Sequence, residues 1–194
     1  MTEVRAARAE DAATIAAIDP GSLGSPAQIR ALVQGQASLV AVERGQIAGF
    51  LALKPGHFYN RDFIDLLYVA PSWRRHGVGR ALMRAALRNA STSRVFVSTS
   101  QSNAPMRELL RSEGWTPSGV LTGLDEGDPE HVFFHDVAPG QAGFGQPLQA
   151  TGWFRGSPGL TRTLAQLGVR PRPARQAARQ TRLRPGAHLS LIHI

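Results

Sequence analysis

A stretch near the middle of the chain decides the fold: Tyr68-Val69-Ala70-Pro71-Ser72-Trp73-Arg74-Arg75-His76-Gly77-Val78-Gly79-Arg80. An apolar, strand-like run over residues 63–69 leads into it, and an amphipathic helical pattern over residues 77–90 follows it. The first turn of a helix has unpaired N–H groups and a positive dipole end, and glycine lets the backbone come close to a ligand. We therefore expect main-chain amides to bind a diphosphate here, with the arginines adding positive charge.

Two better-known phosphate loops do not fit this stretch. A Walker loop needs a Gly-Lys-Ser/Thr sequence, but the only lysine of the chain is Lys54. A dinucleotide-binding fingerprint needs a third glycine three residues after the second, where this chain has Leu82. The sequence therefore predicts neither a P-loop nucleotidase nor a Rossmann dehydrogenase.

Length and composition predict a single domain with a sizeable core. The chain has 194 residues, of which 42% are apolar. The absence of cysteine excludes disulfides, thiolate catalysis and cysteine-ligated zinc, and we expect no metal. No apolar run approaches about 18 residues, and residues 1–5 do not resemble a secretory signal. We expect a cytoplasmic protein with no membrane contact.

The formal net charge of +8 comes from the last part of the chain. Residues 1–138 hold all 14 acidic residues and 14 of the 22 basic ones, so this part has no net charge. Residues 139–194 hold the remaining arginines and no acid. We therefore expect a globular domain over 1–138 and, over 139–194, a basic Arg/Pro/Gly-rich tail that is disordered or non-native sequence.

The tail allows two interpretations. Its arginines are suited to phosphate contacts with RNA or another acidic surface. Alternatively, enrichment in Arg, Pro, Gly and Ala without acids is what a shifted reading frame in a GC-rich gene would produce, and the abrupt apolar ending at 189–194 agrees with that. We favour the second interpretation, and we expect no nucleic-acid partner except through the tail. The sequence leaves a homodimer open.

Periodicity and turn residues predict a mixed α/β layer fold in the order β-α-α-β-β-β-α-β-α-β-β. Strands are expected over residues 2–8, 38–43, 47–53, 63–69, 94–99, 115–121 and 132–137. Helices are expected over residues 11–18, 26–34, 77–90 and 103–113. Short turns containing glycine join the early strands as hairpins.

Two blocks of this sequence resemble the GNAT (GCN5-related) N-acetyltransferase family. Arg74-x-x-Gly77-x-Gly79 is similar to the family's Gln/Arg-x-x-Gly-x-Gly/Ala signature, and Val69-Ala70-Pro71 before it is similar to the end of the family's fourth strand. Asn103, followed by an apolar helix and Gly114-Trp115, resembles the block after the family's fifth strand. The order of elements matches over roughly residues 2–138.

The resemblance implies a mixed, mostly antiparallel central sheet flanked by helices, in which strands four and five splay apart. Acetyl-CoA is the implied co-substrate: its pantetheine arm bonds to the backbone of strand four and its diphosphate to the amides of the loop. The expected cofactor-binding residues are Leu67, Val69, Arg74, Arg75, His76, Gly77, Val78, Gly79, Arg80 and Asn103. A primary amine of an acceptor then attacks the thioester directly, without a covalent enzyme intermediate.

The acid and base of the reaction are less defined. Many members of the family have a tyrosine where this chain has Leu110, so no general acid is assigned, and the thiolate of CoA can leave unprotonated because its pKa is modest. Asp65 has the same parity as Leu67 and Val69, so all three side chains are expected on one face of strand four. Asp65 is a candidate base acting through water, or a structural carboxylate. His57 and Tyr59 are alternative acceptor-site residues.

The acceptor is not identified by the sequence. GNAT substrates include antibiotics, polyamines, amino acids and protein N-termini, and variable loops choose among them. The acidic turn over residues 125–130 either attracts a cationic acceptor or only aids solubility, and we favour the second. The alternative function is a module that binds acyl-CoA, or associates with nucleic acid, without turnover; the missing tyrosine favours it.

Overall fold

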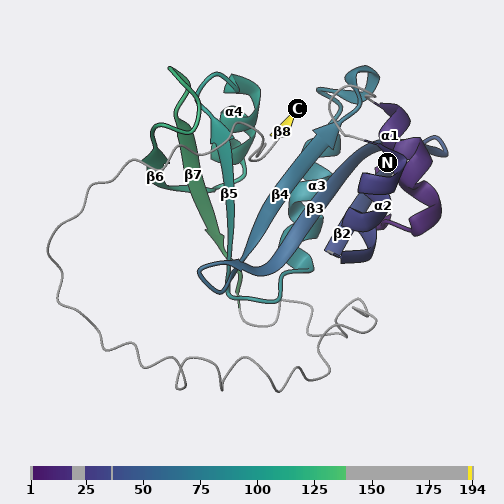
Figure 1. Cartoon of the computed structure of the whole chain (residues 1–194), viewed down its shortest axis with the longest axis horizontal. Helices are drawn as coiled ribbons and strands as arrows, with labels where there is room; N and C mark the ends of the chain where they lie inside the picture. Colours follow the sequence, from purple (N-terminus) through teal and green to yellow (C-terminus); the bar gives the residue numbers. More distant parts are fainter. Residues whose placement is uncertain (1, 19–24, 36, 139–191, 194) are drawn as a thin grey trace, which may run out of the picture. The chain divides into compact units, whose positions relative to one another are not determined.

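The computed structural model describes residues 2–18, 25–35, 37–138 and 192–193, which belong to one compact unit. They form a mixed sheet with helices on both faces, as Figure 1 shows. The expected fold class is confirmed. The predicted tail, residues 139–194, lies outside the described residues apart from Ile192 and His193. No helix in the described ranges is both long and apolar enough to cross a membrane.

Seven described strands form the sheet in the order β1-β2-β3-β4-β5-β7-β6, and an eighth pairs with β4. Only β4 with β5 and β4 with β8 are parallel. The strands are β1 (Glu3–Ala6), β2 (Ala37–Glu43), β3 (Gln46–Phe58), β4 (Arg61–Val69), β5 (Arg94–Ser100), β6 (Thr116–Leu121), β7 (Glu130–Asp136) and β8 (Ile192–His193).

The β3–β4 hairpin is longer than the sequence predicted. The strand was expected to end at residue 53, but β3 runs on to Phe58 with an irregular register. The chain reverses at Tyr59 and Asn60, whose φ angles are 50° and 59°. Two left-handed residues in succession are typical of a tight two-residue hairpin turn.

The described helices are α1 (Ala12–Ile18), α2 (Pro26–Gly35), α3 (Val78–Arg88) and α4 (Ala104–Ser112). The start of α2 is a capping box, because Gln28 N donates to Ser25 Oγ (3.3 Å) and Ser25 N donates to Gln28 Oε1 (2.7 Å). At α4, Met106 N donates to Asn103 Oδ1 (3.2 Å). The predicted helix positions agree with these to within a few residues.

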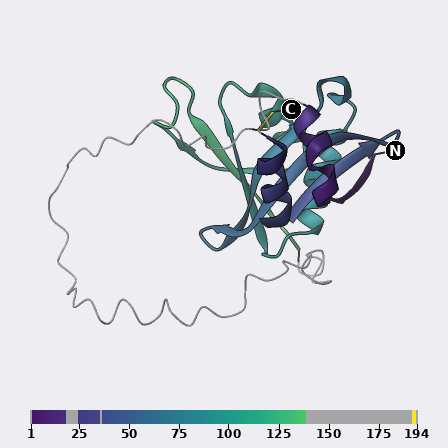
Figure 2. The same ribbon diagram turned by 45° about the vertical axis from the view of Figure 1, so that its right-hand side comes forward.

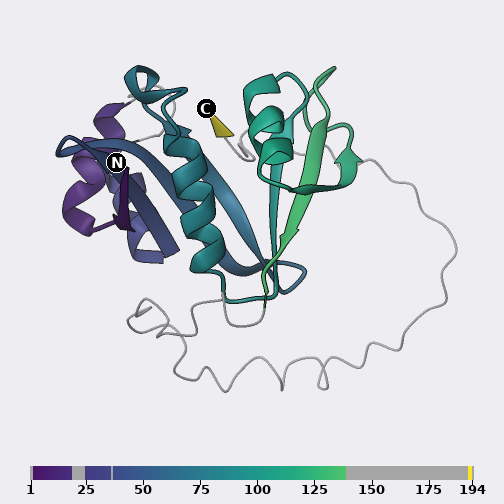
Figure 3. The ribbon, with the colours of Figure 1, turned by 180° about the vertical axis from the view of Figure 1, so that it is seen from behind.

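Two separate cores hold the helices against the sheet. On one face, α3 and α4 bury Leu82, Met83 and Leu110 against the strands, and Figure 3 shows these helices from behind. On the other face, α1 and α2 bury Ile15 and Ile29 against β2, β3 and β4, and Figure 2 brings them forward. Burying each large aliphatic side chain stabilises the fold by roughly 1.5–3 kcal/mol.

A β-bulge interrupts β4. Leu53 of β3 lies opposite Ile64, but its neighbour Ala52 lies opposite Leu66, so Asp65 is an extra residue in the β3–β4 register. A bulge of this kind inserts one residue and changes which face the following side chains reach.

The bulge overturns the expectation that Asp65 shares a face with Leu67 and Val69. Ile64 joins Leu67 and Val69 in the core under α3 and α4. Asp65 instead forms an ion pair with Lys54 (2.8 Å). Lys54 lies next to Leu53, whose side chain belongs to that core, so the side chains of Lys54 and Asp65 lie on the opposite face of the sheet. The bulge breaks the strict alternation of side chains at Asp65. The sequence gives no sign of this extra residue, so the prediction was wrong.

Strands β4 and β5 pair over only three residues before they separate. The parallel ladder joins Asp62, Phe63 and Ile64 to residues 95–97, and the two strands then diverge towards the top of Figure 1. The divergence leaves the edge of β4 beyond Ile64 unpaired with β5, and β8 pairs there, opposite Leu67 and Tyr68. The predicted splay of strands four and five is therefore present.

Asp62 anchors the base of this short ladder. Its side chain is fully buried and accepts hydrogen bonds from Gly56 N (3.1 Å), Ser91 N (2.5 Å) and Ser91 Oγ (2.8 Å). In return, Asp62 N donates to Thr92 Oγ1 (3.1 Å). The carboxylate thus ties β3 and the α3–β5 connection to the start of β4.

Replacing Asp62 is expected to weaken the fold strongly. Asp62→Ala leaves several buried donors unsatisfied, which costs about 2–4 kcal/mol. Urea unfolding of the variant measures the loss, and Glu126→Ala, at an exposed position, is the matched control with a change within about 0.5 kcal/mol. Equal stability of the two variants would contradict the anchoring role.

Candidate functional site

The loop between β4 and α3 contains two left-handed residues. A short 3-10 turn, Pro71–Trp73, follows β4, and then Arg75 and Gly77 have φ angles of 64° and 84°. Alternation of left-handed and ordinary residues makes a backbone concavity that suits anions. Gly77 precedes the first turn of α3, where amides have no partner within the helix.

Arg74 stabilises the start of this loop. Its Nε donates to Val69 O (3.2 Å), and its guanidinium carbon lies 5.9 Å from the Tyr68 ring centroid. The His76 ring, through Nδ1, lies 2.7 Å from Arg74 O. Arg74 therefore shapes the loop, whereas the sequence predicted that it adds charge and binds the cofactor.

The remaining loop residues divide between exposed and buried positions. Arg75, His76 and Gly77 are exposed, while Val78 and Gly79 are buried at the start of α3. The loop is thus open on its outer side, as a ligand-binding turn has to be.

Arg80 is engaged elsewhere. Its Nε lies 2.7 Å from Glu113 Oε1, and Arg84 Nε lies 2.6 Å from Glu113 Oε2. The Glu113 side chain is only 8% exposed. This cluster joins α3 to the end of α4, so Arg80 is not simply an extension of the basic loop.

A cavity of about 450 Å³ lies between the loop and α4. The loop contributes residues 73–75 and 77–80, and α4 contributes Pro105, Glu108, Leu109 and Ser112. This volume is within the range of small-molecule sites. The cavity brings together most of the loop residues expected to bind the cofactor, and Val69 also lines it.

Three of the expected cofactor residues, Leu67, His76 and Asn103, do not line this cavity. Leu67 is fully buried in the core, so only its backbone at the edge of β4 faces the divergence. Asn103 caps α4 through its Oδ1 atom. The amides at the start of α3 and the cavity beside them therefore fit the diphosphate of CoA, and the edge of β4 fits its pantetheine arm.

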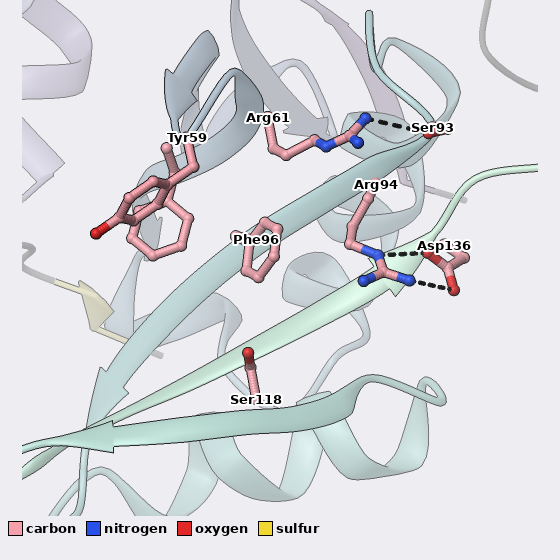
Figure 4. A pocket seen from close by; sticks show the side chains of 8 residues that line it. Tyr59, Arg61, Ser93, Arg94, Phe96, Ser118 and Asp136 are labelled. Carbon is pink, nitrogen blue, oxygen red and sulfur yellow. Dashed lines mark hydrogen bonds and ion pairs between the residues drawn. The ribbon is translucent and has the colours of Figure 1, made fainter.

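A second cavity, of about 530 Å³, lies at the other end of β4 and β5 (Figure 4). Phe58 and Phe96 form its apolar side, with ring centroids 4.9 Å apart. Arg94 donates to both carboxylate oxygens of Asp136 (2.6 and 3.1 Å). Tyr59 lines this cavity and is 87% exposed.

The other acceptor-site candidates have simpler surroundings. His57 is exposed on β3. Asp65 is three-quarters buried and paired with Lys54, as described above. The structure therefore does not bring His57, Tyr59 and Asp65 together at one point.

The acidic turn is not only a solvated loop, contrary to the expectation from its composition. Ser102 donates to the Asp128 carboxylate through its N (2.8 Å) and Oγ (2.6 Å). These hydrogen bonds lower the pKa of Asp128. Asp128 thus ties the β6–β7 hairpin to the connection between β5 and α4.

Glu130 is a residue that the sequence analysis missed. Its Oε1 atom is buried and has no hydrogen-bond partner in the described ranges. Burial is the largest cause that raises the pKa of Glu130, and the nearby negative charges of Asp125 and Asp128 add to it. One signal in the sequence could have indicated that Glu130 is partly buried: it lies two residues before the apolar Val132, and therefore on the same face of the strand.

Comparison with known proteins identifies the family. Residues 11–115, more than half of the chain, match the model described as the acetyltransferase (GNAT) family. The chain belongs to the GNAT acetyltransferase family. Enzymes of this family use acetyl-CoA and act on amine acceptors. No curated protein matches the sequence at a significant level.

Solved structures share the GNAT fold. A GNAT acetyltransferase from Bacillus cereus is 29% identical, with a TM-score of 0.66 over 72% of this chain and 99% of its own. The ribosomal-protein-S18-alanine N-acetyltransferase from Escherichia coli is 15% identical, with a TM-score of 0.58 over 72% and 96% of the two chains. A Salmonella typhimurium protein described as an acetyltransferase, solved with acetyl-CoA, is 18% identical, with a TM-score of 0.59 over 71% and 94%.

Leu110 is the residue that the sequence analysis placed at the position of the expected tyrosine. It is fully buried in the core with Met106 and has no titratable group. In the described part of the chain, no group of three or more His, Cys, Asp or Glu side chains is placed to hold a metal ion.

Gly77 provides a direct test of the loop. Gly77→Ala is expected to weaken CoA binding at least tenfold, because an alanine at φ 84° is strained by about 1–2 kcal/mol and relaxes by moving the adjacent amides. A clash is not the cause, since a Cβ at this position meets nothing within 4 Å. Titration calorimetry with CoA measures the change.

Gly123→Ala is the matched control for that variant. Gly123 has φ 83° and equally open surroundings, but it lies in the β6–β7 connection. The two variants should lose similar stability, and only the first should lose affinity. Equal CoA affinities would remove the loop from the binding site.

Proposed function

We propose that this GNAT protein transfers the acetyl group of acetyl-CoA to a primary amine. The observation that carries the proposal is the exposed loop with left-handed residues at 75 and 77. This loop opens onto the cavity beside α4 and follows the edge of β4 that does not pair with β5. Backbone donors at a helix start suit a diphosphate, and an open strand edge suits an amide-containing arm.

In this proposal, each part of the chain has a distinct task. The amides of residues 75–80 bind the diphosphate, and Arg75 adds charge from its exposed position. The backbone of Leu67 and Val69 bonds to the pantetheine arm, although Val69 O also accepts from Arg74. Asn103 stabilises the start of α4 beside the same cavity. Acetyl-CoA supplies an activated thioester, and the acceptor amine attacks it directly.

The leaving thiolate needs no tyrosine in this scheme. A thiol has an ordinary pKa near 8.5, so its thiolate is a tolerable leaving group near neutral pH. Leu110 is buried and supplies no proton. The competing proposal is that the protein binds acyl-CoA without turnover. Its only support is the leucine, in place of a tyrosine, at position 110.

An amine panel separates the two proposals. Thiol release from acetyl-CoA is measured with spermidine, an aminoglycoside, free amino acids and a peptide that begins with alanine. Amine-dependent release is expected with at least one of these classes, at a rate at least tenfold above hydrolysis. Tight CoA binding with no release on any amine would instead support the acyl-CoA sensor.

We further propose that residues 1–138 form the catalytic domain and that the tail has no part in transfer. The matched GNAT structures are covered almost completely by about 72% of this chain, which supports the boundary. A homodimer and a cytoplasmic location are compatible with the proposal and are not needed for it.

Removing residues 139–194 tests the role of the tail. The melting temperature and kcat should be unchanged, and the KM for acetyl-CoA should not rise. Ile192 and His193 pair with the part of β4 that pantetheine would use, so their removal frees this edge. A large fall in kcat for the 1–138 protein, measured beside the full chain, would show that the tail takes part.

A further inference from the structure

Glu130 lies at the level where β4 and β5 have just separated. It is the first residue of β7 and pairs with Ser100, whereas the last β4–β5 pair is Ile64 with Val97. The positions of β5 from residue 98 onward therefore border the divergence. Glu130 is two positions along β7 from Val132, which pairs with Ser98.

The side chain of Glu130 is on the face of the sheet away from α4. Phe133 belongs to the core under α3 and α4, and side chains alternate along a strand. Phe134 accordingly contacts Phe96 on the other face, with ring centroids 5.9 Å apart. Glu130 has the same parity as Phe134, and Ser98, with the parity of Phe96, lies on the same face of the neighbouring strand, because Ser98 pairs with Val132 and Ser100 pairs with Glu130.

No cation balances this carboxylate in the described part of the chain. Its Oε1 atom is buried and has no hydrogen-bond partner there. The charged groups that act on it are Asp125 and Asp128, which repel it, and His131, which weakly favours its charge. Asp65, on the same face, differs because Lys54 already pairs with it. A buried carboxylate oxygen without a partner is costly unless a ligand supplies one.

We propose that Glu130 is the catalytic base, which binds the acceptor ammonium on the face away from α4 and removes its proton. This inference rests on the proposed acetyl transfer. The loop at the end of β4 holds the diphosphate in that proposal, so the acetyl end of the arm reaches back towards the point where the strands meet. Ser98 is the first residue of β5 beyond that point, and it lies on the same face of the sheet as Glu130, in the neighbouring strand.

The step balances without another reactant. The ammonium gives one proton to the Glu130 carboxylate and becomes a neutral amine. The amine nitrogen forms a bond to the thioester carbonyl carbon, and the carbon–sulfur bond breaks. The sulfur leaves with the bonding electron pair and takes the second nitrogen proton to become the thiol of CoA. Glu130 then releases its proton to water.

The environment of Glu130 suits this role. A carboxyl with a raised pKa is a stronger base towards an ammonium than an ordinary glutamate. It must be ionised to act, so kcat/KM should fall as the pH drops through the raised pKa. Asp125→Asn removes one repelling charge and should move this fall to lower pH, with little change in the maximal rate.

The test compares four variants with the full-length wild-type chain, using acetyl-CoA and the best amine of the panel: Glu130→Gln, Glu130→Asp, Asp125→Asn and Asp65→Asn. Glu130→Gln should lower kcat about 100-fold or more, with the KM for acetyl-CoA unchanged. It should also abolish the fall of kcat/KM at low pH, which is the acid limb of the pH profile. Glu130→Asp should restore part of the rate. Asp65→Asn should keep the acid limb.

Stability provides a readout that separates catalysis from a structural role. Because the pKa of Glu130 is raised in the folded state, ionisation disfavours folding, and the wild type loses stability as the pH rises from its unfolded pKa to its folded pKa. Glu130→Gln should therefore melt at the same temperature as the wild type at pH 4 and at an equal or higher temperature at pH 7.

The possible failures are distinct. If the wild type binds acetyl-CoA but releases no thiol with any amine, the proposed function fails and this inference fails with it. If the wild type is active but Glu130→Gln keeps the acid limb, or loses activity only in proportion to a lower melting temperature, the inference alone is overturned. Loss of the limb in Asp65→Asn assigns the base to Asp65 instead.

Discussion

The separation of β4 from β5 is the constraint on which the site depends. Backbone N–H and C=O groups that leave a sheet must find other partners, so an open strand edge inside a domain is stable only beside solvent, another segment or a ligand. Here the parallel ladder ends at Ile64 and Val97, and Asp62 fastens its base through buried hydrogen bonds. The anchor and the divergence lie within a few residues of each other.

The opened edge links two regions with different chemistry. At the end of β4, Arg74 and the left-handed residues Arg75 and Gly77 direct the chain into α3. The backbone amides of this exposed loop and of the first turn of α3 form the first region. Near the start of the divergence, the face away from α4 carries Ser98 and Glu130. A thioester arm laid along the edge would join a phosphate-binding end to an end with a carboxylate. The GNAT family membership agrees with that arrangement.

The sequence predicted the architecture well because its signals were local. Pro26, Asn103 and Gly77 mark helix starts, and each does so in the structure. The faces of β4 were not predictable in the same way, because the bulge at Asp65 arises from pairing with β3, a long-range effect. Glu130 was missed for a related reason: the burial of its Oε1 atom depends on tertiary packing that composition does not reveal.

Hydrogen–deuterium exchange with and without CoA shows whether CoA binds along the edge of β4 and the loop that follows it, since exchange reports on the backbone amides themselves. The account predicts that CoA slows exchange in two segments, residues 65–69 and 74–80, while β1 and β2 at the far side of the sheet exchange as before. Saturating CoA that leaves both segments unchanged, or protects only the cavity around Phe58 and Phe96, would contradict it.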